Sequence, residues 1–395
     1  MKRTAITERL AGLGGAKWAI HKEARALAAQ GHDVILLTIG EPDVGTPPEL
    51  IEATCDALHR GRTTYSNGRG EAGLLRALAS HYSQTSGRKI DVDQVLTFPG
   101  TQTALFAILM GVAEAGDEVL VGDPMYATYG GVIRASGATV VPVPLRHEDG
   151  FRIRAEDISE RITESSRVIF LNTPHNPTGA ILHREDLQAI GELARKHDLW
   201  IVSDEVYEAL VFEGETHCSA LSDPDHADRV IIASSISKSH AAPGFRSGWC
   251  VGPAEFTSAL LPLSETMLFG NQPFIADMTE KAIDEGSSVA ASMKQRYAAR
   301  SALLGRRLHQ ETSLTVHLPQ AGMFAMVNVT STGMNGDDYA LDLLKQTGVA
   351  VMSGASFGKS MTDWVRVALT VSDEQFEAAC DRIVAHASGL EKGVA

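Results

Sequence analysis

Short β-branched runs alternate with amphipathic stretches between about residue 94 and residue 252. The runs are continuously apolar, as in VIFLN and LWIVSD, which is typical of strands buried on both faces of a sheet. Between several of them lie helical patterns such as 184–196. Strands separated by helices imply crossover connections, so the pattern predicts an α/β fold with a mostly parallel sheet. The seven predicted strands are 94–98, 118–121, 139–142, 168–171, 200–203, 230–233 and 249–252.

The pattern changes near residue 290. A long helical stretch is predicted at 289–310, four short apolar runs follow it, and a last helix is predicted around 374–389. This order predicts a smaller α+β domain. We expect the N-terminal helix and the turn IGEPDVGTPP to pack against that domain, which leaves a site between the two domains. We therefore predict a large domain at 45–288 and a small domain formed by 1–44 and 289–395.

The charge balance argues against several classes of partner. The chain has 35 Lys and Arg against 49 Asp and Glu, a formal charge of −14, and no long basic run. Such a chain is a poor candidate for binding nucleic acid or an anionic membrane. No stretch approaches the roughly 18 uninterrupted apolar residues of a membrane span. The four cysteines are far apart and form no C-x-x-C pair, so we expect no metal site and a reduced, cytoplasmic setting.

A lysine surrounded by hydroxyl groups follows one predicted strand, in SSISKSHAAPGFRSG. The amine of Lys238 can form a Schiff base with an aldehyde. Ser235 and Arg246, which lies eight positions after the lysine, can hold a phosphate group. On this segment alone, a solvated surface lysine in a serine-rich loop is the commoner case.

Polar side chains also follow two other predicted strands, where ligands of α/β sheets bind. Asp204 can hold a pyridinium nitrogen protonated, and Tyr207 can bond a phenolic oxygen. Asn176, in LNTPHNPTG, offers an amide donor and acceptor. The alternatives are that Asp204 caps the next helix and that Asn176 belongs to an ordinary turn.

A glycine-rich turn, FPGTQT, joins a predicted strand to an apolar helix. Gly100, Thr101 and Gln102 can form an anion site with the backbone N–H groups of the helix start. The alternative is a glycine turn in which Thr101 caps the helix. A Walker loop is excluded because no G-K-[ST] follows, and the dinucleotide fingerprint is incomplete because Lys17 replaces its third glycine.

Two further residues point to a ligand. Tyr126 follows a predicted strand and can stack on a planar ring. Arg366 stands inside the apolar run WVRVALT. Because an unpaired buried arginine is costly, we expect an anionic partner, either a substrate carboxylate or a structural Asp or Glu.

Together these motifs resemble the class I/II aminotransferases, which belong to fold type I of the pyridoxal-phosphate enzymes. The resemblance runs from IGEPDVGTP to WVRVALT, nearly the whole chain. It implies a large domain with a mostly parallel seven-stranded sheet, a smaller α+β domain, and pyridoxal 5′-phosphate as cofactor. It also implies transamination between an L-amino acid and a 2-oxo acid in a homodimer with composite active sites.

The resemblance also assigns roles to single residues. Lys238 is expected to bond the cofactor covalently, Asp204 to contact its pyridine nitrogen, and Tyr207 to act with them in catalysis. Arg366 is expected to clamp the substrate carboxylate, with Gly40 and Asn176 beside it. The remaining cofactor-binding residues are expected to be Gly100, Thr101, Gln102, Tyr126, Asn176, Ser235, Arg246 and, from the neighbouring subunit, Tyr65.

The preferred substrate is less clear from the motifs. SDEVYEALVFEGE and SISKSHAAPGFRSGW resemble bacterial aspartate and arginine–pyruvate transaminases, and the run at 122–144 leans toward the arginine–pyruvate type. An aspartate/2-oxoglutarate transaminase and a β-lyase on the same fold are the alternatives. Glu41 and Asp43 are expected at the entrance, where they favour a basic donor unless they only shape the turn. One departure from the usual M-T-G-W-R pattern is Pro243.

Overall fold

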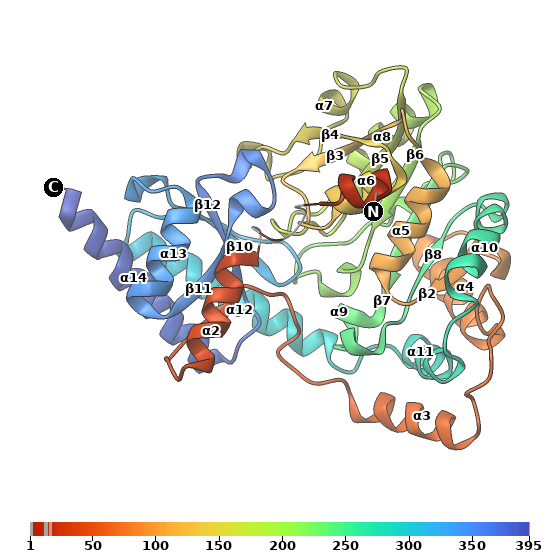
Figure 1. Ribbon diagram of the computed structural model, residues 1–395, viewed down its shortest axis with the longest axis horizontal. Coiled ribbons are helices and arrows are strands. Elements are labelled where there is room, and N and C mark those ends of the chain that lie inside the picture. The colour runs from red at the N-terminus through yellow and green to blue at the C-terminus, as the bar shows by residue number, and fades with distance from the viewer. Residues whose placement is uncertain (1–2, 12–14, 16–17, 395) are drawn as a thin grey trace.

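The structure, a computed structural model, describes residues 3–11, 15 and 18–394. It contains two β-sheets with helices packed around each of them (Figure 1). The seven-stranded sheet lies in the middle of the chain, and the five-stranded sheet joins segments from both ends.

The seven-stranded sheet has the order β2-β8-β7-β6-β5-β3-β4. Only β8 runs antiparallel to its neighbours, so the sheet is mostly parallel, as predicted. The seven predicted strands are confirmed, with ends that differ by up to a few residues. They are β2 (Val95–Phe98), β3 (Glu118–Asp123), β4 (Thr139–Pro144), β5 (Ser166–Asn172), β6 (Trp200–Asp204), β7 (Val230–Ser235) and β8 (Gly248–Val251).

Both faces of this sheet are covered, which explains the continuous apolar runs. Ile169 of β5 points into one hydrophobic core, and its neighbour Phe170 points into the other. The first core contains side chains from α3 (Pro48–His59), α4 (Ala72–Ser86), α7 (Ala155–Ser159), α8 (Arg184–Lys196) and α11 (Pro273–Glu285). The second contains side chains from α5 (Thr101–Val112), α6 (Tyr129–Ser136) and α10 (Ala254–Leu268).

The five-stranded sheet has the order β1-β11-β12-β10-β9, with β1 parallel to β11 and the other pairs antiparallel. The N-terminal segment packs here as expected, because β1 pairs with β11 and α2 contacts it. Strand β1 itself was missed, since its three residues are too few for a periodic signal. The elements are β1 (Ile35–Leu37), β9 (Thr315–His317), β10 (Phe324–Asn328), β11 (Val349–Ser353), β12 (Trp364–Ala368), α2 (Ala19–Ala29), α12 (Ala290–Glu311), α13 (Gly336–Thr347) and α14 (Asp373–Val394).

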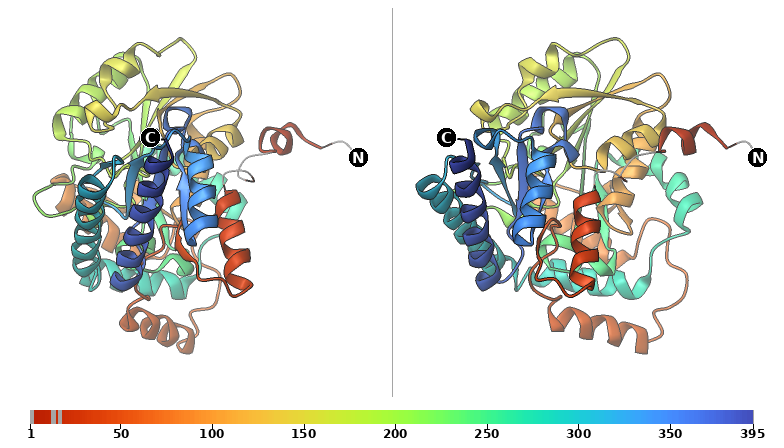
Figure 2. Two further views of the ribbon diagram at one scale, coloured as in Figure 1. Left: turned by 90° about the vertical axis from the view of Figure 1, so that its left-hand side faces the viewer. Right: turned by 60° about the vertical axis from the view of Figure 1, so that its left-hand side comes forward.

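The first helix, α1 (Ala5–Arg9), contacts the large-sheet side instead. Arg9 donates hydrogen bonds to the backbone carbonyls of Arg134 (3.0 Å) and Ala135 (3.3 Å) at the end of α6. Apart from this contact, α1 projects from the molecule (Figure 2). The N-terminal region thus contacts both parts of the protein.

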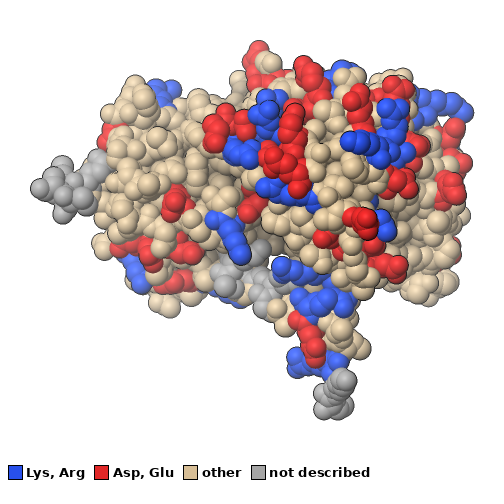
Figure 3. Space-filling view, turned by 90° about the horizontal axis from the view of Figure 1, so that it is seen from above, with Lys and Arg blue, Asp and Glu red and all other residues tan. Residues whose placement is uncertain are grey.

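Helix hydropathy and surface charge bear on the expected partners. Within the described residues, no helix is both long enough and apolar enough to cross a membrane. The face shown in Figure 3 carries acidic and basic side chains interspersed, without a large basic patch.

Candidate active site

A cavity of about 230 Å³ receives side chains from the segments of both sheets. Ligands of open α/β sheets bind outside the carboxyl ends of the strands, and the cavity lies at those ends of β6 and β7. We call Thr101, Asp204, Ser235 and Lys238 the large-sheet wall. We call Trp18, Gly40, Phe324 and Arg366 the small-sheet wall.

Most residues selected from the sequence meet in this cavity. Gly100 lies directly behind it, against Arg246, and Tyr65 does not reach it. The predicted residues that line the cavity are Gly40, Thr101, Gln102, Tyr126, Asn176, Asp204, Tyr207, Ser235, Lys238, Arg246 and Arg366. Lining residues that the sequence analysis missed are Trp18, Ile39, Leu105, Tyr129, Val206, Ser237 and Phe324.

Asp204 is buried at the end of β6, and its two carboxylate oxygens are held separately. Oδ2 accepts a hydrogen bond from the Tyr129 hydroxyl (2.7 Å), and Oδ1 accepts one from the backbone N–H of Val206 (3.2 Å). Burial raises the pKa of Asp204 to about 6. The helix-cap alternative is wrong, because Tyr207 is the N-cap of the short 3₁₀ helix that follows.

A chain of hydrogen bonds connects the two walls. The Asn176 amide donates to the Tyr207 hydroxyl (3.3 Å), and its Oδ1 accepts a bond from Arg366 Nη1 (3.1 Å). The backbone N–H of Asn176 is fixed by the side chain of Asn172 (2.8 Å). Asn176 therefore links a residue of the large-sheet side to the cation of the small-sheet wall.

Lys238 lies in α9 (Ile236–Ser239), directly after β7, and is partly buried. Its Nζ donates a hydrogen bond to the backbone carbonyl of Gly40 (2.5 Å). Burial lowers the pKa of Lys238 to about 8, and the nearby charge of Glu41 counteracts part of that effect. The interpretation as a solvated surface lysine is therefore wrong. A buried amine with a lowered pKa is a better nucleophile and base than an ordinary lysine.

An anion cradle lies at the N-terminus of α5. Gly100 has φ +87°, and a Cβ at this position would lie 2.2 Å from Arg246 Nη2, so only glycine fits. The hydroxyl of Thr101 is buried without a hydrogen-bond partner. Thr101 does not cap the helix, because Gly100 is the N-cap. A helix N-terminus, an unpaired hydroxyl and a guanidinium together suit a phosphate group.

Pro243, the departure from the usual pattern, belongs to a short 3₁₀ helix, Pro243–Phe245. Its carbonyl accepts a hydrogen bond from Arg246 Nη1 (2.8 Å), and the carbonyl of Pro99 accepts one from Nη2 (3.2 Å). Arg246 adopts a left-handed backbone conformation with φ 52°. The altered loop therefore still presents the guanidinium to the cavity.

Arg366 is buried on β12 and has no carboxylate partner among the described residues. Its Nη2 donates to the carbonyl of Thr38 (2.6 Å), while its Nε is buried and unpaired. The rings of Phe324 and Phe357 lie 3.9 Å and 4.5 Å from its Cζ. Burial lowers the pKa of Arg366 to about 10. Because no structural Asp or Glu balances this charge, the site suits an anionic ligand.

The expectation that Asp43 faces the entrance is wrong. Its side chain is buried and forms ion pairs with Arg296 (3.0 Å) and Arg300 (2.8 Å), and it accepts a hydrogen bond from Tyr297 (2.9 Å). Burial alone would raise the pKa of Asp43, but these partners lower it below its usual value. Glu41, in contrast, is exposed and forms no ion pair with any described residue. Of these two acidic residues, only Glu41 therefore has a carboxylate that can act on a ligand.

Tyr65 lies outside the cavity and is 86% exposed. Its ring contacts Phe269, which is 67% exposed (ring centroids 5.0 Å apart). The proposed role of Tyr65 needs a second subunit, so one chain cannot test it.

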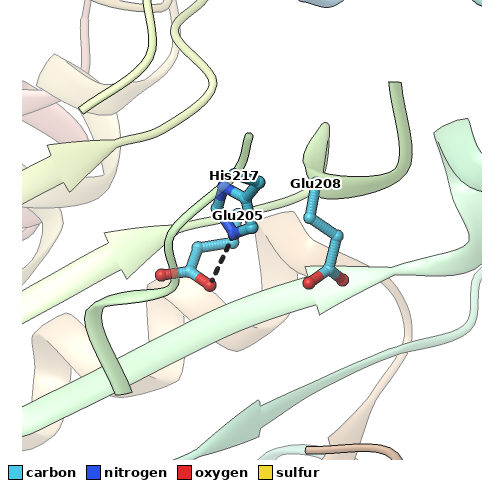
Figure 4. A group of neighbouring side chains, drawn as sticks. All are labelled: Glu205, Glu208 and His217. Atoms are coloured by element: carbon cyan, nitrogen blue, oxygen red, sulfur yellow. Dashed lines mark hydrogen bonds and ion pairs between the residues drawn. The ribbon is translucent and has the colours of Figure 1, made fainter. Parts of the chain in front are cut away.

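Glu205, Glu208 and His217 form a second group of titratable side chains (Figure 4). Glu205 is fully buried and lies 3.4 Å from His217, and Glu208 accepts a hydrogen bond from Ser234 of β7 (2.9 Å). Burial raises the pKa of Glu208 to about 7. For His217, burial lowers the pKa, but the neighbouring carboxylates of Glu205 and Glu208 together raise it above its usual value.

The fold is that of a known class of enzyme. Residues 32–383 match the family described as aminotransferase class I and II. The chain belongs to this family and is an aminotransferase.

Named relatives lie within this family. The arginine–pyruvate transaminase AruH of Pseudomonas aeruginosa is 41% identical, with 99% of each chain covered. An aspartate aminotransferase of Musicola paradisiaca is 30% identical, with 96% of each chain covered. Among solved structures, a mutant aspartate aminotransferase of Thermus thermophilus superposes with a TM-score of 0.92 at 29% identity, covering 98% of this chain and 99% of the other.

Proposed function

We propose that this aminotransferase binds pyridoxal 5′-phosphate through Lys238 and transfers the amino group of a neutral or basic L-amino acid, arginine first, to pyruvate. The observation that carries the proposal is the placement of the Lys238 amine and the buried Asp204 carboxylate in the wall of one cavity. An aldehyde carbon and a pyridine nitrogen at opposite ends of one ring require such a pair.

The residues present fit this cofactor. The cradle of Gly100, Thr101 and Arg246 suits its phosphate, since the unpaired Thr101 hydroxyl gains a partner there. Ser235 and Gln102 line the same region. Tyr126 offers a ring for stacking, and the Tyr207 hydroxyl and the Asn176 amide suit the phenolic oxygen.

The cofactor, when bound, supplies an electron sink for the carbanion that forms when the donor loses its α-proton. Asp204 keeps the pyridine nitrogen protonated, and Tyr129 holds the carboxylate in place. Arg366 binds the α-carboxylate of the donor through charge-assisted hydrogen bonds. The Lys238 amine would hold the aldehyde of the cofactor and, when free, would accept the proton of the donor Cα at its Nζ.

Two observations support a neutral or basic donor. The relative at 41% identity is named for arginine and pyruvate. In addition, the cations that line the cavity are Lys238, Arg246 and Arg366, counted over the described residues, and all three already have roles. A dicarboxylate donor such as aspartate needs one more cation, because an unpaired buried carboxylate is costly.

A panel of donors and acceptors tests the substrate. We expect a higher kcat/KM for arginine than for aspartate, with pyruvate as a competent acceptor. A tenfold preference for aspartate, about 1.4 kcal/mol of transition-state discrimination, would contradict the assignment. Release of pyruvate and ammonia without any acceptor would instead identify a β-lyase.

Substitution of the lysine tests the chemistry. We expect Lys238→Ala to abolish steady-state transamination and the absorbance band of the lysine-bound cofactor, because Lys238 is the one lysine among the described residues that line the cavity. Lys345→Ala is the matched control, since Lys345 is exposed on α13. Near wild-type turnover of the purified Lys238→Ala protein would refute the role.

The active unit in this proposal is a homodimer in which Tyr65 reaches the phosphate in the partner subunit. The exposed rings of Tyr65 and Phe269 form an apolar patch suited to an interface. Mixing inactive Tyr65→Ala and Lys238→Ala subunits should restore some activity, because one hybrid site keeps both wild-type residues. A monomer at micromolar concentration in sedimentation would overturn the proposal.

Two further parts of the proposal concern the whole chain. The four cysteines are free, which supports a cytoplasmic location. The large domain at 45–288 and the small domain at 1–44 with 289–395 remain a prediction, which the separation into two sheets supports.

A further inference from the structure

Trp18 lines the cavity on the small-sheet wall, although the sequence analysis did not predict it as a site residue. It stands just before α2, is partly buried and lines the cavity. It packs against a small cluster formed by Ala127, Met352 and Phe357. Its ring meets that of His21 edge to face, with centroids 6.4 Å apart.

Two routes connect Trp18 to the cation that binds the substrate carboxylate. Through packing, Trp18 touches the cluster of Phe357, whose ring lies 4.5 Å from the guanidinium of Arg366. Through hydrogen bonds, His21 is joined to the Thr38 hydroxyl (2.8 Å), and the Thr38 carbonyl accepts a bond from Arg366 (2.6 Å). The indole is therefore fixed relative to Arg366.

The orientation of a donor follows from the two walls. With its carboxylate at Arg366 and its amino group near Lys238, the donor must extend its side chain along lining residues that bind neither group. On the small-sheet side these residues are Trp18, Ile39 and Phe324. The Phe324 ring already lies against the Arg366 guanidinium (3.9 Å), so Trp18 is the aromatic residue of this set that is left for the donor side chain.

Among the described lining residues, an aromatic face rather than a free carboxylate is available to a cationic side chain. The carboxylate that lines the cavity in the described structure is Asp204, and both its oxygens are already bonded on the opposite wall. Burial, and then the charge of Arg25, lower the pKa of His21, so its ring is neutral at pH 7 and does not repel a cation. Glu41 is exposed, and its negative charge acts on Lys238 of the cavity lining. Indole is the best of the aromatic side chains for a cation–π contact.

We infer that Trp18 determines donor specificity by holding a planar cationic side chain, a guanidinium group, against its indole face beside Arg366. This inference rests on the proposed transamination and names the group that recognises the substrate.

Arginine and citrulline provide a matched pair of donors, since both side chains are long and planar but only arginine is charged. In the wild-type holoenzyme, kcat/KM for arginine should exceed that for citrulline by about tenfold. Trp18→Leu keeps an apolar side chain but removes the ring, so the ratio should fall to about one. Trp18→Phe keeps a weaker ring and should give an intermediate ratio.

A binding measurement separates recognition from chemistry. Calorimetry can compare 5-guanidinopentanoate with 5-ureidopentanoate, which both lack the α-amino group. The guanidino compound should bind the wild type with the lower dissociation constant, and Trp18→Leu should bind the two compounds equally. If Trp18→Leu does not fold, the dissociation constants of the two compounds are compared between the wild-type and Trp18→Phe proteins instead. Equal binding of the two compounds to the wild type, or an unchanged ratio without the ring, would overturn the inference.

The two proposals fail in different ways. If the wild type transfers the amino group of alanine to 2-oxobutyrate but does not distinguish arginine from citrulline, only the role of Trp18 is refuted. If it transfers no amino group from any of these donors, the proposed function itself is refuted.

Discussion

On the large-sheet wall both carboxylate oxygens of Asp204 have protein partners, whereas on the small-sheet wall the Arg366 guanidinium has no carboxylate partner among the described residues. Asp204 is held by Tyr129 and Val206 before any ligand binds. Arg366 has an unpaired Nε and no carboxylate near it in the described structure. The first wall is thus preorganised for a group that stays, and the second for an anion that enters and leaves at each turnover.

Removal of Asp204 should have the largest effect on turnover. We expect Asp204→Asn to lower kcat by roughly 10³-fold, the effect of losing a preorganised charge. Because the folded pKa is raised to about 6, the ionised carboxylate opposes folding above the pKa of the unfolded chain. The variant without cofactor should therefore melt at a higher temperature than the wild type at pH 8. A lower melting temperature with full activity would mean that Asp204 is structural.

Substitution of Asp43, which anchors the turn that carries Gly40, should have a large effect on the free energy of unfolding instead. Asp43→Asn leaves the Arg300 guanidinium without its buried charge partner, so the free energy of unfolding at pH 7 should fall by about 3 kcal/mol. The folded pKa of Asp43 is lowered, so its contribution is present above pH 3.8 and is lost as the pH falls through the folded value. Denaturant titrations at pH 7 and pH 3 measure this difference. If the donor preference changed as well, Asp43 would have a role in binding.

Arg366→Lys tests whether the small-sheet wall binds the substrate carboxylate through the guanidinium group. Lysine cannot form two parallel bonds to a carboxylate, so kcat/KM should fall by roughly 10- to 100-fold for every donor. The absorbance of bound cofactor should not change, because Arg366 belongs to the other wall. A loss of cofactor would show that the two walls are not independent.

The smallest expected effect is that of the Glu41 charge on the pKa of Lys238. The charge of Glu41 raises the pKa of Lys238, so Glu41→Gln should lower it. The rate at which an aldehyde reacts with Lys238 in the protein without cofactor should then reach its plateau at a lower pH. Glu49→Gln, which removes an exposed carboxylate that accepts a hydrogen bond from Ser288, should leave the profile unchanged. An unchanged profile for Glu41→Gln would place its carboxylate too far away to act.

The large-sheet wall was largely predictable, because its residues follow strands whose apolar runs are readable in the sequence. Asp204 and Lys238 each come directly after such a run. Tyr129 was missed because its hydrogen bond to Asp204 joins the start of α6 to the end of β6, which are far apart in the sequence. The resemblance to a family supplied the roles, which the pattern alone left open.

The small-sheet wall was harder to predict, because it combines segments from both ends of the chain. Arg366 stood out as a charge in an apolar run, but nothing in the sequence marked Trp18 as a lining residue. The interpretation of Asp43 failed for the same reason, since its partners Arg296 and Arg300 lie far along the chain. Spacing and periodicity carry no information about such contacts.

Strand β1 has a consequence for the order of folding. It pairs with β11, so an early segment of the chain depends on one of the last. During synthesis the strands of the seven-stranded sheet emerge well before β11, and closing so long a loop is slow. Until then the N-terminal segment has no strand to join, and Gly40, three residues beyond β1, has no fixed position. The carboxylate-binding side should therefore mature last, and a nascent chain should acquire the cofactor pocket before it can orient a substrate.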